Sequence, residues 1–175
     1  PLTPTTPLQK ALPPQSPQLT NILNNVTPDA DSYPLNGVGG SIAALEDVLD
    51  LKTPGGLIDG LALNYPGSNH SPLEAFVLRF TTPDVGRIPN GPLTNQLLTP
   101  GGLDGIEGLL PWGSGTPWTY PFTGTGFTAS PTHITPEYIL REATMDAGAQ
   151  LVKIATDGTE TILRTLTEAG DWVTP

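Results

Sequence analysis

Apolar and polar residues alternate most regularly in the middle and toward the end of the chain. Between residues 73 and 82, aromatic and aliphatic side chains occupy every second position, which predicts a β-strand. Two further apolar runs lie on either side of Asp157-Gly158, between residues 149 and 166. Because Asp-Gly is a favoured centre for a tight turn, we predict a β-hairpin there.

Apolar residues recur at helical spacing in three other segments, 19–26, 41–51 and 133–145. Ser41 can cap a helix over residues 41–51, and Thr135 can cap one over residues 133–145. The sequence therefore predicts a short helical turn, an early helix and a late helix. The late helix would be followed directly by the hairpin.

Turn residues punctuate these segments, and the string Thr-Pro-Gly-Gly-Leu occurs twice, at residues 53–57 and 99–103. We predict that the first copy ends the early helix, since Pro cannot continue a helix and Gly favours the left-handed residue that follows one. The segments around the two copies do not match, which favours repeated turn chemistry over a duplicated domain.

The first 18 residues include six Pro and predict extended backbone. They are either a linker or an arm that packs on a partner or on its own domain, and we favour the arm. Residues 19–175 are then expected to form one domain. At the far end of the chain, Trp172 and Val173 are expected to cover a sheet edge. The residues that could anchor the arm are Leu2, Leu8, Ala11 and Leu12.

Together these elements predict a small, loop-rich α+β domain with short strands, a C-terminal helix plus β-hairpin, and an extended Pro-rich N-terminal arm. The chain has 21 Pro and 20 Gly among 175 residues, a content that limits long regular elements. It contains no cysteine, so disulfides, thiolate metal sites and cysteine catalysis are excluded.

The net charge of −10 comes from only seven basic and seventeen acidic residues. Nucleic-acid binding needs clustered Lys and Arg, so we do not expect a nucleic-acid partner. There is also no run of eighteen apolar residues, and we expect no membrane insertion.

The residues available for catalysis or metal binding are few. His70 and His133 each lie in a loop with Ser and Pro, and a hydrogen-bonding role fits both better than catalysis or metal binding. Asp29, Asp31 and Ser32 resemble the start of a calcium loop without its remaining ligands, so we expect no metal site. A glycoside-cleaving or carbohydrate-binding module remains an alternative, with a carboxylate pair drawn from Asp59, Asp104 and Glu107.

Three short motifs in order define the leading enzymatic alternative. They are Arg79 within Ala-Phe-Val-Leu-Arg-Phe, the segment 126–130 ending at Ser130, and a late Glu at position 160 or 168. This order resembles toxin domains of the ADP-ribosyltransferase type. The resemblance implies an activity that consumes NAD, with Arg79 on the cofactor phosphates and Glu160 or Glu168 on the ribose.

The strongest functional signal is a cluster of aromatic residues between residues 109 and 127, separated by Gly, Pro, Thr and Ser. Trp and Tyr dominate the energetics of protein interfaces. We therefore expect a non-enzymatic structural or interaction module of a larger extracellular or particle-type assembly, with protein partners or further copies of this chain. The expected location is extracellular, on a cell surface or in a virion, with the cytoplasm as the alternative. The expected contact residues are Trp112, Trp118, Tyr120 and Phe122.

Overall fold

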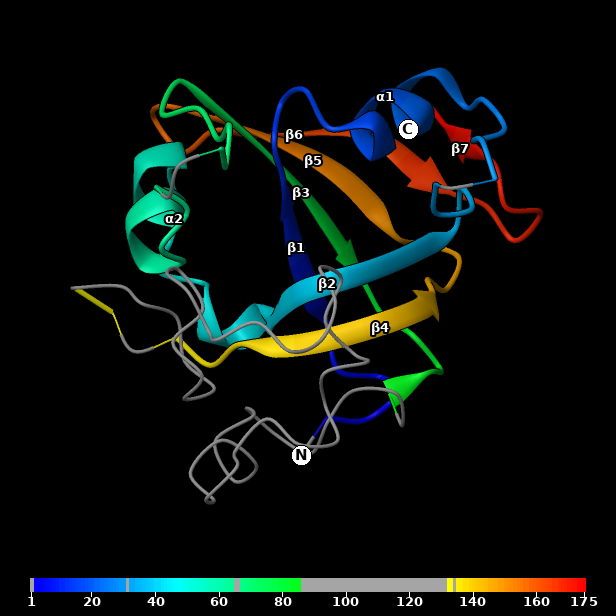
Figure 1. The fold of residues 1–175 in the computed structure, drawn as a ribbon, viewed down its shortest axis with the longest axis horizontal. Helices are drawn as coiled ribbons and strands as arrows, with labels where there is room; N and C mark the ends of the chain where they lie inside the picture. The colour runs from blue at the N-terminus through cyan, green and yellow to red at the C-terminus, as the bar shows by residue number, and fades with distance from the viewer. Residues whose placement is uncertain (1, 31, 65–66, 86–131, 134) are drawn as a thin grey trace.

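The first strand of the chain lies near the middle of a seven-stranded antiparallel sheet with the order β4-β2-β1-β3-β5-β6-β7 (Figure 1). The computed structural model describes residues 2–30, 32–64, 67–85, 132–133 and 135–175. In this part of the chain the architecture is mostly β, with two α-helices and one short 3-10 helix. The elements are β1 (Leu8–Leu12), α1 (Pro17–Asn24), β2 (Gly37–Ala44), η1 (Leu45–Asp47), α2 (Pro54–Gly60), β3 (Glu74–Phe80), β4 (Tyr138–Thr144), β5 (Gln150–Ala155), β6 (Glu160–Leu166) and β7 (Trp172–Val173).

Three of the predicted elements are present in the structure. The strand expected at residues 73–82 is β3, and the expected hairpin is β5 followed by β6. Gly158 has a φ of 87°, and its backbone N–H donates to the carbonyl of Ala155 at 2.9 Å, which closes the turn. The short helical turn is α1, which begins at Pro17.

The helix predicted over residues 41–51 is wrong, because this segment begins as β2 and continues as η1. β2 pairs with β1 on one side and with β4 on the other, and seven of its eight residues are buried. A strand buried on both faces loses the apolar–polar alternation by which strands are recognised. Its small and aliphatic residues therefore also satisfy a helical spacing.

The helix predicted over residues 133–145 is also wrong, because residues 138–144 form β4. β4 pairs antiparallel with β2, with Tyr138 opposite Ile42 and Thr144 opposite Gly37. The first Thr-Pro-Gly-Gly copy does not end a helix but starts one. Thr53 is the N-cap of α2, where its Oγ1 accepts a hydrogen bond from the backbone N–H of Gly56 at 3.0 Å.

An extended arm does not describe residues 8–12, which form β1 inside the sheet. β1 pairs with β2 at Leu8 and Gln9, and with β3 along its whole length. Leu8 and Leu12 are buried in the core, as expected of two of the anchor residues. Residue 18 lies within α1, so the first strand and first helix both draw on the Pro-rich segment.

The two helices cover opposite faces of the sheet. Leu78 and Val77 are neighbours on β3 and therefore point to opposite faces. Leu78 packs in a core cluster that includes Leu19 and Ile22 of α1, whereas Val77 packs in a second cluster with Leu57 of α2. Figure 1 places the helices accordingly, with α2 at the left and α1 at the upper right.

The sheet curls where β1 and β2 meet. Their pairing is limited to Leu8 with Ala44 and Gln9 with Ala43. The preceding part of β2, from Gly37 to Ile42, pairs with β4. A β-bulge between Val38 and Gly40 bends β2, and in Figure 1 the β2–β4 pair crosses β1 and β3. The divergence opens a space between β1 and β2 that no backbone ladder fills.

None of the helices in the described ranges is long and apolar enough to cross a lipid bilayer.

Candidate functional site

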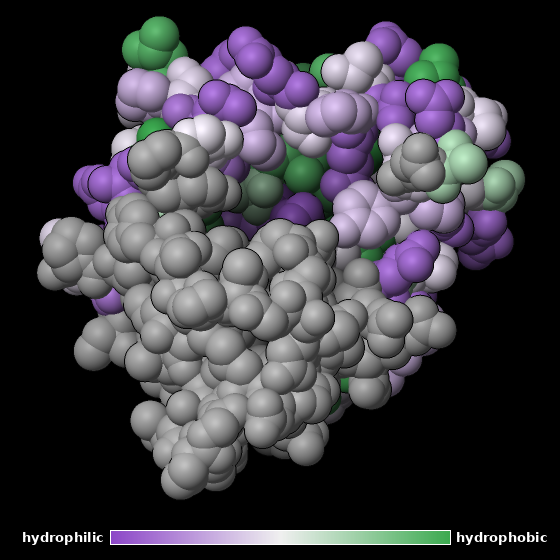
Figure 2. All heavy atoms as spheres, in the orientation of Figure 1, coloured by the Kyte–Doolittle hydropathy of each residue, from purple (hydrophilic) through white to green (hydrophobic). Residues whose placement is uncertain are grey.

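A pocket of about 90 Å³ lies where β1 and β2 diverge. We call it the Lys10 pocket, after the cationic residue in its wall. Figure 2 shows that the face toward the viewer is hollowed between α2 and α1, with both hydrophobic and hydrophilic atoms at depth. The residues that line the pocket are Gln9, Lys10, Ala11, Ser41, Ile42, Ala43, Leu61, Leu63, Pro136 and Glu137.

Lys10 extends from the core face of β1 toward the bulge of β2. It alternates with the buried Leu8 and Leu12, so its side chain leaves the strand on their face. Gly40 adopts a φ of +84°, and a Cβ built there would lie 3.1 Å from Lys10 Nζ. The glycine therefore serves both the bulge backbone and the close approach of the ammonium group.

Burial lowers the pKa of Lys10 from 10.5 to about 8, because the charged ammonium loses water; the Glu137 carboxylate partly opposes this shift. Burial raises the pKa of Glu137 from 4.5 to about 7, against a hydrogen bond from Ser41 and the charge of Lys10. The pKa of His70 is lowered first by burial and then by the charge of Lys10.

The two opposite shifts bring the proton affinities of Lys10 and Glu137 close together near neutral pH. Titratable groups with shifted pKa values in a pocket are typical of functional sites. The sequence predictions missed this site, because Lys10 lay in the supposed arm and Ser41 and Glu137 in supposed helices. The available signal was a single Lys at the alternating position between Leu8 and Leu12.

A second hollow, the Arg79 pocket, lies over the face of the sheet that α2 covers and measures about 370 Å³. Arg79 Nη1 lies 2.5 Å from Glu160 Oε2, and Arg79 Nε donates to Gln9 Oε1 at 2.9 Å. These contacts hold the guanidinium group between β1 and β6. The lining residues are Leu45, Val48, Leu49, Leu51, Lys52, Arg79, Ile154, Gly158 and Glu160.

A third hollow of about 420 Å³ adjoins the Arg79 pocket and shares Leu45 and Leu49 with it. The side of the third hollow away from the Arg79 pocket is formed by residues 5–7 and Glu46. We call the two hollows together the Leu49 groove. Leu49 lies at their junction with 60% of its surface exposed.

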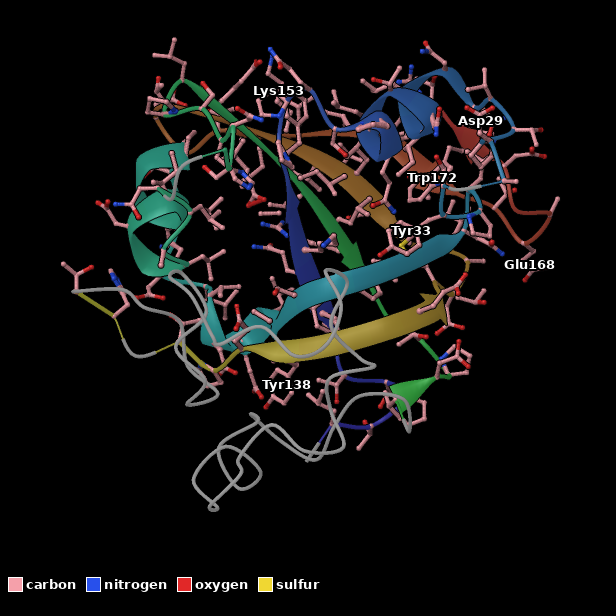
Figure 3. The ribbon with its side chains drawn as sticks, viewed as in Figure 1. Asp29, Tyr33, Tyr138, Lys153, Glu168 and Trp172 are labelled. Atoms are coloured by element: carbon pink, nitrogen blue, oxygen red, sulfur yellow. The ribbon has the colours of Figure 1, made fainter. Side chains whose placement is uncertain are left out.

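The residues chosen for the dinucleotide alternative are only partly brought together. Glu160, at the start of β6, pairs with Arg79. Glu168 lies beyond the other end of β6, in the connection to β7 (Figure 3). Ser130 lies outside the described residues.

Of the other residues predicted from the sequence, some lie outside the described part of the chain and some lie within it. The aromatic contact residues Trp112, Trp118, Tyr120 and Phe122 lie outside the described part of the chain, as do Asp104, Glu107 and the second Thr-Pro-Gly-Gly-Leu copy. Asp59 lies in α2. Trp172 pairs with the end of β6 and is buried, and its Nε1 donates to the Leu35 carbonyl at 2.6 Å (Figure 3).

His133 makes polar contacts with two neighbouring side chains. His133 Nδ1 is 2.8 Å from Thr132 Oγ1, and His133 Nε2 is 3.4 Å from Asp50 Oδ2. Among the residues that the structure describes, no group of three or more His, Asp or Glu side chains could hold a metal ion.

Comparison with known proteins adds no relative: no family model, no curated protein and no solved structure matches this chain.

Proposed function

We propose that this domain is an interaction module that binds an apolar segment of a protein partner in the Leu49 groove. The observation that carries the proposal is the position of Leu49, 60% exposed at the junction of two hollows. A single exposed Leu is ordinary, but concave apolar surface beside it is typical of a binding site. Leu45, Val48 and Ile154 extend the apolar surface into the groove.

Acidic residues beside the groove favour a basic partner. Glu46 lines the groove, and Asp47 and Asp50 follow it closely along the chain. The pKa of Asp47 is raised by burial and then by the neighbouring Glu46 carboxylate, so the carboxylates repel one another. A cation from a partner relieves this repulsion, and the chain's net charge of −10 steers such a partner toward it.

The setting we propose is a larger extracellular or particle-type assembly, in which the partner is another protein or a further copy of this chain. Trp112, Trp118, Tyr120 and Phe122 are proposed as additional contacts. Their support is compositional, since aromatic residues spaced by Gly and Pro suit a contact surface.

Selection from a displayed library of random peptides tests the proposal. We expect enrichment of peptides in which Leu, Ile or Phe is flanked by Lys or Arg, with affinity that weakens as salt rises. Leu49→Asp should reduce the affinity of the selected peptides at least about tenfold, because it places a charge against the apolar anchor.

The matched control is Leu73→Asp. Leu73 is 74% exposed and precedes β3, away from the residues of the Leu49 groove. It should leave the affinity unchanged. Absence of any enriched peptide, or equal loss of affinity in both variants, would contradict the proposal.

A second candidate function, consumption of NAD in the Arg79 pocket, is favoured by the contact between Arg79 and Glu160. These two residues were selected from sequence order alone, and they line one pocket. The test is release of nicotinamide from NAD by the purified chain, with Arg79→Ala as the matched variant. No release above a buffer blank, or equal release by both proteins, rejects this candidate.

A further inference from the structure

We propose that Lys10 is a nucleophilic amine that forms an imine with a small carbonyl compound in the Lys10 pocket, with Glu137 transferring the protons. The site is separate from the Leu49 groove and goes beyond the interaction function proposed above. It rests first on geometry: the pocket lies between two diverging strands and has Lys10, Ser41 and Glu137 in its wall.

The position of the amine is fixed by its surroundings. The β1 backbone on either side of Lys10 is paired with β3, with Lys10 itself opposite Leu78. At the other end of the side chain, Nζ lies against Gly40, where the absence of a side chain leaves room for it. An amine held in this way is positioned before any ligand arrives, which favours reaction with a bound electrophile.

The charged and titratable groups around the amine come from separate elements. Glu137 lies just before β4 and its charge raises the pKa of Lys10, whereas His70 lies before β3 and has its own pKa lowered by the charge of Lys10. Ser41 of β2 hydrogen-bonds to Glu137. With its pKa lowered to about 8, Lys10 is partly neutral at physiological pH, and with its pKa raised to about 7, Glu137 is partly protonated.

The dimensions and lining select the class of ligand. A volume of about 90 Å³ exceeds several-fold the roughly 10–15 Å³ that one water molecule needs, and so admits a ligand of a few heavy atoms. Ala11, Ile42 and Leu61 offer an apolar surface to a short carbon chain. A small aldehyde or ketone matches both the apolar wall and the polar end.

The reaction balances with the groups present. The neutral Nζ attacks the carbonyl carbon, the C–N bond forms, and the oxygen takes a proton from the Glu137 carboxyl group. The nitrogen then releases a proton to the Glu137 carboxylate. Glu137 returns that proton to the hydroxyl group, the C–O bond breaks, and water leaves. The products are a protonated imine on Lys10 and the Glu137 carboxylate, which neutralises the new charge.

Reductive trapping tests the proposal on the intact chain. The protein is incubated at pH 7 with acetaldehyde and cyanoborohydride, and ethylation of each lysine is followed over time by peptide mass spectrometry. The chain contains only Lys10, Lys52 and Lys153, so two lysines serve as internal controls. Lys153 is paired with Glu74 at 3.1 Å on the surface.

We expect Lys10 to be ethylated at least about tenfold faster than either control lysine. At pH 7, a pKa of about 8 gives a neutral fraction roughly 300-fold larger than a pKa of 10.5, which leaves a margin for restricted access and weaker nucleophilicity. The rate should pass through a maximum between about pH 7 and 8, because the reaction needs both the neutral Lys10 amine and the protonated Glu137 carboxyl group. Ethylation of Lys10 at or below the rate of Lys52 and Lys153 would overturn the proposal.

The Glu137→Gln variant distinguishes a role of Glu137 in proton transfer from an effect of its charge alone on the pKa of Lys10. If Glu137 transfers protons, the variant should ethylate Lys10 at least about tenfold more slowly. If Glu137 acts only by its charge, its loss lowers the pKa of Lys10 further, and ethylation becomes faster or stays the same; either result overturns its role. Circular dichroism and a urea unfolding curve show whether the variant remains folded. If it does not, the comparison of the three lysines in the unmodified chain still decides the proposal.

Discussion

Truncation of Leu8 should strongly destabilise the fold. It is fully buried, it lies on a strand paired on both sides, and it belongs to the larger core cluster. Leu8→Ala should lower the free energy of unfolding by about 2–5 kcal/mol, since it removes buried methyl groups and leaves a cavity. The midpoint of urea unfolding measures this change.

Leu73→Ala is the matched control, because Leu73 is 74% exposed. Its effect should stay within about 0.5 kcal/mol. Similar losses in the two variants would mean that β1 is not part of the core in solution.

Glu137 should make stability depend on pH between its ordinary pKa of 4.5 and its folded pKa of about 7. In that interval the folded chain holds a proton that the unfolded chain has released, so the free energy of unfolding falls as pH rises. Glu137→Gln should remove this component. Urea midpoints at pH 4.5 and 7 measure it, and an unchanged difference in Glu137→Gln would contradict the assignment.

The contribution of Lys10 to the free energy of unfolding changes with pH in the opposite direction. Between its folded pKa of about 8 and its ordinary pKa of 10.5, the unfolded chain holds the extra proton, so its contribution to stability rises with pH. Lys10→Met should abolish this rise. If the free energy of unfolding changes with pH equally in the wild-type chain and in Lys10→Met, the ammonium group of Lys10 is well hydrated in the folded chain.

At the scale of elements, the local sequence correctly predicted those elements whose hydrogen bonds join residues close together in the chain. The hairpin of β5 and β6 needs only Asp157-Gly158 and its two flanking apolar runs, and α1 needs only its own apolar stripe and Pro17. β2 and β4 are different, since they are stabilised as strands by pairing with each other. Their own residues also fit a helix, and a partner about a hundred positions away is invisible to a local pattern.

The candidate site was missed for the same reason. Lys10, Ser41 and Glu137 come from three segments whose predicted structures were an arm and two helices, and only long-range strand pairing brings them to one pocket. Arg79 and Glu160 were chosen from the order of short motifs along the chain, and the pairing of β3 with β5 and of β5 with β6 brings the two residues together.

The start of α2 offers a test of capping at this scale. Thr53→Ala should destabilise the protein by about 1 kcal/mol, because the N–H of Gly56 loses its hydrogen bond to Thr53 Oγ1. Ser16 is the N-cap of α1 but makes no side-chain capping bond. Ser16→Ala should therefore change the urea midpoint little, and a loss as large as that of Thr53→Ala would contradict the capping account.

For the molecule as a whole, the central place of β1 predicts how trypsin attacks the folded chain. Cleavage after Lys10 requires β1 to leave both neighbours, whereas Lys52 lies in the connection between η1 and α2. Cleavage after Lys52 should come first, and cleavage after Lys10 should follow the rate of global opening. Sites of early cleavage are identified by mass spectrometry.

The reference for this experiment is the chain in urea at a concentration that unfolds it but leaves trypsin active. There, both sites should be cut at comparable rates. Rapid cleavage after Lys10 under native conditions would show that the first strand detaches without unfolding of the rest.

The order of strands in the sheet also constrains how the protein is made. As the chain leaves the ribosome, β1 emerges before β3, the strand with which it pairs along its whole length, and β2 has no second neighbour until β4 is made about a hundred residues later. Between the synthesis of β2 and that of β4 the nascent chain thus carries unpaired strand edges, a state prone to association with other chains. We expect ribosome-bound chains that stop before Tyr138 to remain bound to a chaperone, and chains that include β7 to be released from it, which can be measured by affinity isolation of stalled ribosomes.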